Sequence, residues 1–379
     1  MVAFDTEFVA EDTYTPHLCL IQVAAHDALA IIDPLAIDDL SPFWNLLTTG
    51  GRTTLVHAGR EEFRFCKRET GKRPEKLFDT QLAAGLVGIE FPTSYGNLVS
   101  KLLKKQLSKG ETRTDWRRRP LSDRQIDYAL QDVLYLQGIY EQLTEKLTSM
   151  QRAGWLEEEI ERWQLHVEAA ESGERWRKVS GAAGLNSRAL AVVHALWTWR
   201  ESEAQNRNTP PRRVLRDDLI VELARRQSSD TSRISGIRGM NHRGLQRHLP
   251  AIASAIAEAL SLPNSQCPAK VLRPPAHASL NLIGQFLSTA LGSISRNAKL
   301  APGIVGTTQD MRDLVAYRLA VSGSTQSPPP LLATGWRKEV VGTVVEDLLT
   351  GLLAIRIRDP LSDEPLEFFP STEAKREGT

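Results

Sequence analysis

The amino-acid sequence predicts an α/β domain over roughly the first 150 residues, followed by two smaller domains built from helices. Short runs of strand-forming residues alternate with helix-like segments in the first part of the chain. The strand signal then ends, and short amphipathic helices with Gly- or Pro-containing turns follow. The length of 379 residues suits two or three domains of ordinary size.

The expected elements of the α/β domain follow in order along the chain. Val, Ile, Leu, Phe and Thr residues mark the strands, and apolar residues at helical spacing mark the helices. The expected strands cover residues 2–8, 18–25, 28–32, 53–57 and 76–78, and the expected helices cover 38–47, 60–69 and 122–147. Asp79 stands where it can cap a further helix. Strands interleaved with helices predict a sheet covered by helices.

The rest of the chain is expected to form two helical domains joined by a linker. Amphipathic patterns predict helices at 186–200, 217–226, 245–260, 280–295 and 308–319, two short helices within 335–353, and a hairpin from 353–358 and 366–369. The expected divisions are an α/β domain at 1–150, a helical linker at 151–184, a helical domain at 185–262, a Pro-rich linker at 263–276, and a second helical domain with a C-terminal hairpin or tail at 277–379.

Composition and charge exclude several classes of protein. The 47 basic and 46 acidic side chains leave a net charge of +1, which excludes a wholly basic nucleic-acid-binding protein but not a locally basic one. No apolar run could span a membrane and no signal peptide is recognisable, so we expect a cytoplasmic protein with no membrane partner. The three widely spaced cysteines suit a reducing compartment. No glycine-rich phosphate-binding motif occurs, so no nucleotide cofactor is expected.

Two pairs of residues in the α/β domain have the chemistry of a catalytic site. Asp5 and Glu7 are two apart in a strand, so both carboxylates project from one face. Carboxylates among strand residues are costly unless a cation pairs with them, and Mg²⁺ prefers such oxygen ligands. Tyr128 and Asp132 are four apart in a helix and share a face. Each pair alone is a weak signal, and a partly buried Tyr beside a solvated Asp is the simpler interpretation of the second.

The order of these motifs is much more specific than either pair. The helix expected between them begins after His57-Ala58-Gly59 and carries Glu61 and Glu62. With this arrangement the chain resembles the ribonuclease D family, DEDD-type 3′–5′ exonucleases of the subgroup with a catalytic tyrosine. The matching segments are Phe4-Asp5-Thr6-Glu7-Phe8, Thr13-Tyr14-Thr15-Pro16, Leu18-Cys19-Leu20-Ile21-Gln22, Leu55 to Phe63, Phe78-Asp79-Thr80-Gln81, Arg113-Thr114-Asp115-Trp116 and Tyr128-Ala129-Leu130-Gln131-Asp132-Val133. The resemblance implies a ribonuclease H-like exonuclease domain.

The resemblance also implies a reaction. Two divalent metal ions, Mg²⁺ or Mn²⁺, would be held by Asp5, Glu7, Glu62 and Asp132, and Tyr128 would orient the attacking water. The implied enzyme is a metal-dependent 3′–5′ exoribonuclease that releases nucleoside 5′-monophosphates from RNA with a free 3′ end. The expected substrates are tRNA precursors during 3′-end maturation, and the protein is expected to be a monomer.

The chain departs from the family pattern at two places. Glu62 stands where the family has Asp, and the extra methylene keeps the charge but moves the carboxylate by about a bond length. Only four residues precede Asp5, where the family usually has an upstream strand and helix. A strand without that support would hold Asp5 and Glu7 less firmly.

A basic segment precedes the expected catalytic helix. Residues 101–119 hold eight cations against two carboxylates, with Trp116 among them. Cations around a stackable ring suit RNA, and a solvated basic loop is the alternative. The candidate RNA-binding residues here are Lys104, Lys105, Arg113, Trp116, Arg117 and Arg118. Part of the offsetting acid, including Glu159, is expected on a solvated helix.

The first helical domain resembles an HRDC domain, a small nucleic-acid-binding module shared by ribonuclease D and RecQ-type helicases. The matching segments are Leu196 to Glu201, Asn208 to Asp218 and Ile237 to Met240. Arg212 and Arg213 are its candidate phosphate contacts, and a structural or inter-domain role is the alternative. Residues 277–353 resemble a second, more diverged HRDC-like domain. The expected fold is therefore a ribonuclease H-like exonuclease domain followed by two small all-α HRDC-like domains.

Two other functions remain open on the sequence. A DNA 3′–5′ exonuclease of the same superfamily would carry the same motifs, and only the helical modules favour RNA. A catalytically impaired RNA-binding relic would explain Glu62 and the short N-terminus.

Overall fold

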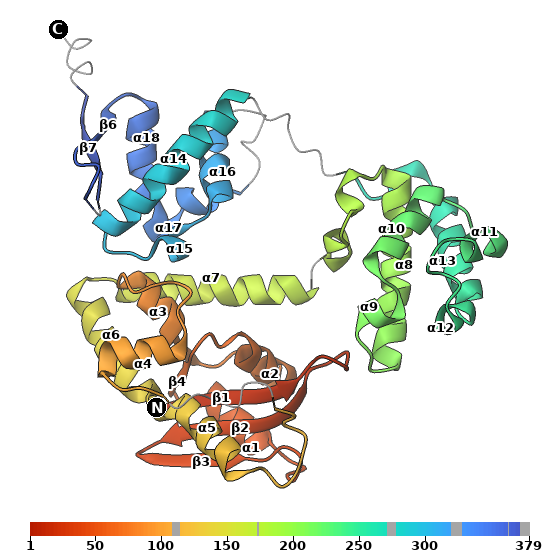
Figure 1. The fold of residues 1–379 in the computed structure, drawn as a ribbon, viewed down its shortest axis with the longest axis horizontal. Coiled ribbons are helices and arrows are strands. Elements are labelled where there is room, and N and C mark those ends of the chain that lie inside the picture. Colours follow the sequence, from red (N-terminus) through yellow and green to blue (C-terminus); the bar gives the residue numbers. More distant parts are fainter. Residues whose placement is uncertain (108–113, 173, 271–277, 320–327, 363, 372–379) are drawn as a thin grey trace.

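Strands and helices divide the molecule into an α/β unit and two groups of helices (Figure 1). The structure is a computed structural model that describes residues 1–107, 114–172, 174–270, 278–319, 328–362 and 364–371. The predicted fold class, an α/β domain followed by helical domains, is confirmed. Among the described residues, no helix is both long enough and apolar enough to cross a membrane.

The α/β unit is built on one five-stranded sheet in the order β3-β2-β1-β4-β5. Its strands are β1 (Val2–Val9), β2 (His17–Ala25), β3 (Ala28–Ile32), β4 (Thr53–Val56) and β5 (Lys76–Asp79). β2 is antiparallel to both β1 and β3, whereas β4 is parallel to both β1 and β5. The strand that carries Asp5 and Glu7 is therefore the central one, held on both sides.

Helices cover both faces of this sheet. They are α1 (Ser41–Thr48), α2 (Arg60–Thr70), α3 (Thr80–Leu86), α4 (Tyr95–Leu103), α5 (Asp123–Leu134) and α6 (Leu136–Ser149). On one face of β1, Phe4 packs edge-on against Trp44 of α1, with ring centroids 6.3 Å apart. Asp5 and Glu7 project from the opposite face because side chains alternate along a strand. Helix α5 contacts β1, β2 and β3.

The single helix predicted over 122–147 is wrong, because the chain forms two helices that meet at Tyr135. Helix α5 begins with a capping box in which Ser122 and Gln125 bond each other's backbone. At its end, the Tyr135 backbone N–H donates to the Tyr95 hydroxyl at 3.0 Å. Leu136 and Ile139 of α6 then bury their side chains in the core. The periodicity was continuous across the break, so it gave no sign of the turn.

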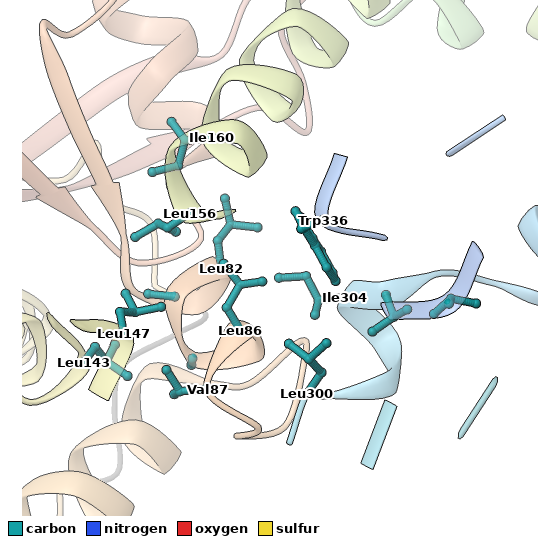
Figure 2. Close-up of a cluster of buried hydrophobic side chains, with 14 of the residues drawn as sticks. Leu82, Leu86, Val87, Leu143, Leu147, Leu156, Ile160, Leu300, Ile304 and Trp336 are labelled. Carbon is teal, nitrogen blue, oxygen red and sulfur yellow. The ribbon is translucent and has the colours of Figure 1, made fainter. Parts of the chain in front are cut away.

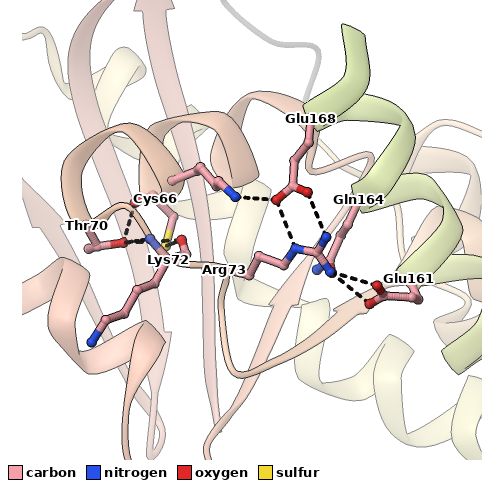
Figure 3. Close-up of polar contacts among 8 residues, drawn as sticks. Cys66, Thr70, Lys72, Arg73, Glu161, Gln164 and Glu168 are labelled. Carbon is pink, nitrogen blue, oxygen red and sulfur yellow. Dashed lines mark hydrogen bonds and ion pairs between the residues drawn. The ribbon is translucent and has the colours of Figure 1, made fainter. Parts of the chain in front are cut away.

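A long helix, α7 (Ala153–Ser172), leads out of the α/β unit and is bound back to it by ion pairs (Figure 3). Arg73 contacts Glu161 at 2.9 Å and Glu168 at 2.7 Å, and Lys67 of α2 also bonds Glu168. Single pairs of this exposure contribute little, but shared partners form a network that orients α7 against α2.

The first helical group has its own hydrophobic core. It consists of η1 (Arg175–Lys178), η2 (Ala182–Gly184), α8 (Ser187–Asn206), α9 (Pro211–Val214), α10 (Asp217–Arg226), α11 (Thr231–Ser235), α12 (Arg243–Gln246), α13 (Leu249–Ser261) and η3 (Asn264–Gln266). Leu196, Ile220 and Ile252 lie at the centre of this separate cluster. Polar contacts from Tyr14, in the loop between β1 and β2, join the group to the α/β unit: its N–H donates to Asn208 at 3.1 Å.

The second helical group shares a core with the α/β unit. It consists of α14 (Ala278–Asn297), α15 (Pro302–Val305), α16 (Thr308–Arg318), η5 (Leu331–Ala333), α17 (Gly335–Arg337), η6 (Lys338–Gly342), α18 (Thr343–Leu349) and the antiparallel hairpin of β6 (Leu353–Ile357) and β7 (Leu366–Pro370). Figure 2 shows Leu82 and Leu86 of α3 meeting Ile304 and Trp336 of this group. The two units are thus packed as one hydrophobic body.

A buried ion pair crosses the same interface. The expectation that Glu159 lies on a solvated face is wrong, because its residue is 5% exposed and its carboxylate contacts Arg337 at 2.6 Å. Arg337 is 3% exposed and also donates to the Val305 carbonyl at 2.8 Å. The pair is satisfied on both sides, which a buried charge requires.

Candidate active site

Asp5 and Glu7 share one face of β1, as their spacing predicts. Both residues are half-buried. In the pairing with β2, Asp5 lies opposite Gln22 and Glu7 lies opposite Leu20. The register shifts directly after Glu7, and such a bulge bends a strand locally. The two carboxylates therefore stand at the last regular stretch of the central strand.

A tight turn between β4 and α2 fixes where α2 begins. Ala58 has a positive φ of 54°, and a Cβ on Gly59 would lie 2.3 Å from Cγ2 of Val56, so only glycine fits there. The buried Asp79 carboxylate accepts bonds from the N–H groups of Ala58 and Gly59 at 3.2 and 2.9 Å. It accepts two more at the start of α3, at 2.8 and 3.3 Å, so the predicted cap is confirmed. Asp79 thereby clamps the starts of two helices together.

Glu62 lies in the first turn of α2 and is 6% exposed. Its Oε1 accepts a hydrogen bond from the Thr6 hydroxyl at 2.5 Å. Thr6 alternates with Asp5 and Glu7 along β1, so its side chain points to the opposite face. The bond holds the Glu62 carboxyl against β1, near enough to Asp5 and Glu7 for its charge to raise their pKa values.

Helix α5 supplies the remaining predicted residues. Tyr128 and Asp132 are one turn apart and both half-buried, and the Tyr128 hydroxyl lies near enough to the Asp132 carboxyl to affect its pKa. The indole of Trp116 lies beside the Tyr128 ring, with centroids 6.1 Å apart. Ala129 packs into the same small cluster, which anchors α5 on β2.

Burial raises the pKa of every carboxyl in the site, and repulsion from the other site carboxylates adds to the effect at Asp5 and Glu7. Burial raises the pKa of Asp5 well above its ordinary value, and the charges of Glu62, Asp132 and Glu7 add to the effect. Burial, then the charges of Asp132 and Glu62, raises the pKa of Glu7 to about 8. Burial raises the pKa of Glu62 to about 7 and that of Asp132 to about 6. Burial and the neighbouring carboxylates also raise the pKa of Tyr128, so its hydroxyl stays protonated.

The donor set fits a divalent cation in chemical type. Within the described part of the chain, no Lys or Arg forms an ion pair with Asp5, Glu7, Glu62 or Asp132. Carboxylate oxygens are the ligands that Mg²⁺ prefers. In these same residues, no three or more His, Cys, Asp and Glu side chains are already gathered as a metal-binding group. Binding an ion would therefore require the carboxyl groups to turn towards one another.

Most of the predicted RNA contacts are exposed. Lys104, Lys105, Arg117 and Arg118 are all at the surface, as are Arg212 and Arg213 in the first helical group. Arg117 is partly neutralised, since it pairs with Asp115 at 2.8 Å and Asp12 at 2.9 Å. Arg113 lies outside the described residues.

The prediction that Trp116 stacks on RNA is wrong for this arrangement. The residue is 3% exposed and packs with Cys19, Leu20 and Ala129. Its apolar neighbours account for the burial, and the ring acts instead as a support for Tyr128.

Sequence reasoning missed two polar side chains at the site. Thr6 holds Glu62, and the signal for it was a hydroxyl side chain within the apolar start of β1. Gln22 is fully buried opposite Asp5, and both amide atoms lack a hydrogen-bond partner in the part of the chain that the structure describes. An amide within the otherwise apolar run of β2 was its signal.

Comparisons with known proteins agree with this geometry. A family described as 3′-5′ exonuclease matches residues 1–148, and the HRDC domain family matches residues 189–256. Ribonuclease D of Zymomonas mobilis is 34% identical, over 94% of this chain and 90% of the relative, and that of Bartonella henselae is 31% identical, over 92% and 85%. The crystal structure of Escherichia coli RNase D, an exoribonuclease involved in structured RNA processing, aligns with a TM-score of 0.79 and 27% identity over 92% of each chain. The ribonuclease H-like fold with an HRDC domain is thereby confirmed, and this fold implies dependence on divalent metal. The chain belongs to the ribonuclease D family of 3′–5′ exonucleases.

Proposed function

We propose that this protein is a divalent-metal-dependent 3′–5′ exoribonuclease that releases nucleoside 5′-monophosphates from the free 3′ end of RNA. The observation that carries the proposal is the placement of Asp5 and Glu7 on one face of the central strand, with Asp132 and Tyr128 supplied by α5 and Glu62 held against the same strand from α2. Relatives named ribonuclease D support RNA as the substrate. We assign the enzyme to tRNA 3′-end maturation, with tRNA precursors as substrates.

In the proposed site, Asp5, Glu7 and Asp132 hold one Mg²⁺ or Mn²⁺ ion, and Asp5 and Glu62 hold a second. Bound ions of this kind neutralise the scissile phosphate and lower the pKa of an attacking water. The protein's own residues set the geometry: β1 presents Asp5 and Glu7 together, and α5 brings Asp132 over them.

Tyr128 acts through its hydroxyl hydrogen. Because its pKa is raised, the phenol is neutral at working pH and can orient water by hydrogen bonding without ionising. Its contact with the indole of Trp116 holds the ring at the site.

The finer organisation belongs to the same proposal. The exonuclease domain spans 1–150, the HRDC domain 185–262 and the second HRDC-like domain 277–379, with linkers between them. Exposed Lys104, Lys105, Arg117, Arg118, Arg212 and Arg213 contact RNA phosphates, and the protein works as a cytoplasmic monomer.

The test is mononucleotide release from 3′-labelled RNA and DNA by purified protein with Mg²⁺ or Mn²⁺. We expect release from RNA that stops in EDTA and in Asp5→Ala or Asp132→Ala protein. Release from DNA in preference to RNA would make the protein a DNA exonuclease. Absence of release from both would leave only RNA binding, and release that persists in Asp5→Ala would overturn the site assignment.

A further inference from the structure

A basic groove runs between the exonuclease domain and the first helical group. It consists of two adjoining cavities of about 350 and 490 Å³, which share Arg64, Arg175 and Pro211. One wall is the outer side of α2 with the loop that follows β1, and the other is formed by η1, α8 and α9 (Figure 1). We call it the inter-domain groove.

The lining of the inter-domain groove is strongly cationic. Its charged residues are the eight cations Arg60, Arg64, Lys67, Arg68, Arg175, Lys178, Arg200 and Arg212 and the three carboxylates Glu61, Glu201 and Asp217. Five of these cations already pair with carboxylates among the described residues: Arg200 and Arg212 with Asp217, Arg64 with Glu61, Arg68 with Glu69, and Lys67 with Glu168. Arg60 and Lys178 are exposed and form no ion pair with any described residue. Positive charge in the groove therefore exceeds what the protein itself offsets.

Helix α2 presents opposite surfaces to the active site and to the groove. Arg60, Arg64 and Arg68 recur every four residues, so they form one stripe about 12 Å long. The buried side of the same helix carries Glu62 and Cys66. Because Arg60 is two residues from Glu62, the stripe starts beside the active site and leads away from it.

Aromatic side chains also line the groove, and hydrogen bonds connect its two walls. Trp197 of α8 and Tyr14 both line the groove, and nucleotide bases stack on aromatic side chains of this kind. Tyr14 also ties the two walls together, because its hydroxyl lies 3.2 Å from Glu201 and its N–H donates to Asn208 at 3.1 Å. The groove is thus a site that neither domain forms alone.

We propose that the inter-domain groove binds the phosphate backbone of the RNA that lies 5′ of the nucleotides in the active site. This inference rests on the proposed exoribonuclease function. Arginine and lysine side chains bind phosphates without reading bases, so the groove adds affinity but no sequence preference. An RNA long enough to reach Arg175 and Lys178 gains this affinity, whereas a dinucleotide in the active site does not.

The test compares an Arg60→Gln/Lys178→Gln double variant with Lys146→Gln, a control that removes an exposed lysine from α6, outside the groove. Fluorescence anisotropy in EDTA measures binding of an RNA of about 20 nucleotides between 50 and 200 mM salt. Steady-state kinetics with Mg²⁺ compare kcat/KM for that RNA and for a dinucleotide. Circular dichroism shows whether each variant is folded.

We expect the double variant to bind the long RNA at least about tenfold more weakly and to lose about two units of the log–log salt slope, one for each phosphate contact. Its preference for the long RNA over the dinucleotide should fall in proportion, and the control should match the unaltered protein. Unchanged affinity and salt slope in a folded double variant would overturn the groove. Failure of the unaltered protein to cleave either RNA would instead overturn the proposed function, because the binding measurement needs neither metal nor turnover.

Discussion

Replacing Asp79 by alanine tests whether one buried carboxylate positions the catalytic helix. Asp79 accepts four backbone bonds, two from the turn before α2 and two from the start of α3. Loss of a helix cap costs about 0.5–2 kcal/mol, and each buried N–H left without a partner costs about 1–3 kcal/mol. Together these predict about 3–5 kcal/mol of local stability. A shift of Glu62 by about 1 Å would lower the rate of hydrolysis by about 100-fold.

Hydrogen exchange is the suitable assay because a chain with several cores has no single free energy of unfolding. Peptides that cover 57–70 and 79–86 should exchange faster by about two to three and a half orders of magnitude, since each 1.4 kcal/mol is about tenfold. Asp230→Ala is the matched control: Asp230 also caps a helix, α11, but at the surface and far along the chain. Wild-type exchange and activity in Asp79→Ala protein would refute the clamp, as would equal effects of both variants on these peptides.

Other predictions concern charge, the catalytic hydroxyl and the core. Tyr128→Phe should lower kcat about 100-fold in steady-state assays without moving its pH dependence, because the phenol acts un-ionised. Glu62→Asp should keep or raise the rate of RNA hydrolysis; a sharp fall would show a site adapted to Glu. The pKa values of Glu7 and Glu62 rise from 4.5 to about 8 and about 7, so both groups hold protons more tightly in the folded metal-free protein than in the unfolded chain. Their contribution to stability is therefore present below pH 4.5 and is lost as the pH rises towards 8. Added Mg²⁺ should reverse that loss in thermal melts, and its apparent affinity should increase with pH in calorimetric titrations because binding displaces those protons. Arg337→Ala leaves the buried Glu159 with Arg162 as its remaining partner. It should destabilise the protein by about 3 kcal/mol, the lower end of the cost of breaking a buried pair, which thermal melts would show as a fall in Tm, whereas a Glu159→Gln/Arg337→Met pair should recover much of it.

The sequence was sufficient to predict the strands and the catalytic motifs that they carry. It was not sufficient to predict the break in the helix expected over 122–147. Alternation along β1 placed Asp5 and Glu7 on one face because the period of a strand is fixed. The break at Tyr135 could not be predicted, since the apolar period continues through it and the Tyr135 backbone N–H donates instead to the hydroxyl of the distant Tyr95. The prediction that Trp116 contacts RNA was wrong for a similar reason. Its position in a basic segment suggested an exposed side chain, whereas tertiary packing against Cys19 and Ala129 buries it.

The sequence predicted the carboxylates of the candidate site but not the side chains that hold them in place. Charged residue types are visible in a sequence, but the Thr6 hydroxyl acquires its role only because α2 packs on that face of β1. The arginine stripe of α2 is visible in the sequence as a four-residue period. Because Glu61 and Glu62 lie in the same segment, the helix was interpreted by its acidic residues instead. Whether a stripe of cations is a solvated surface or a wall depends on what lies opposite, and only the fold brings η1 there.

The two helical groups are attached to the exonuclease domain by different kinds of interaction, one mainly hydrophobic and one mainly polar, and each kind suits a different role. The second group shares a hydrophobic core with it and adds the buried pair of Arg337 and Glu159, so separating them would expose apolar surface and an unpaired charge. The first group keeps its own core and meets the exonuclease domain through polar contacts such as those of Tyr14 with Glu201 and Asn208. Polar contacts of this kind exchange with water at small cost. The rigid attachment therefore supports the catalytic sheet, while the polar one leaves a charged groove open between the domains, where a phosphate backbone can replace water.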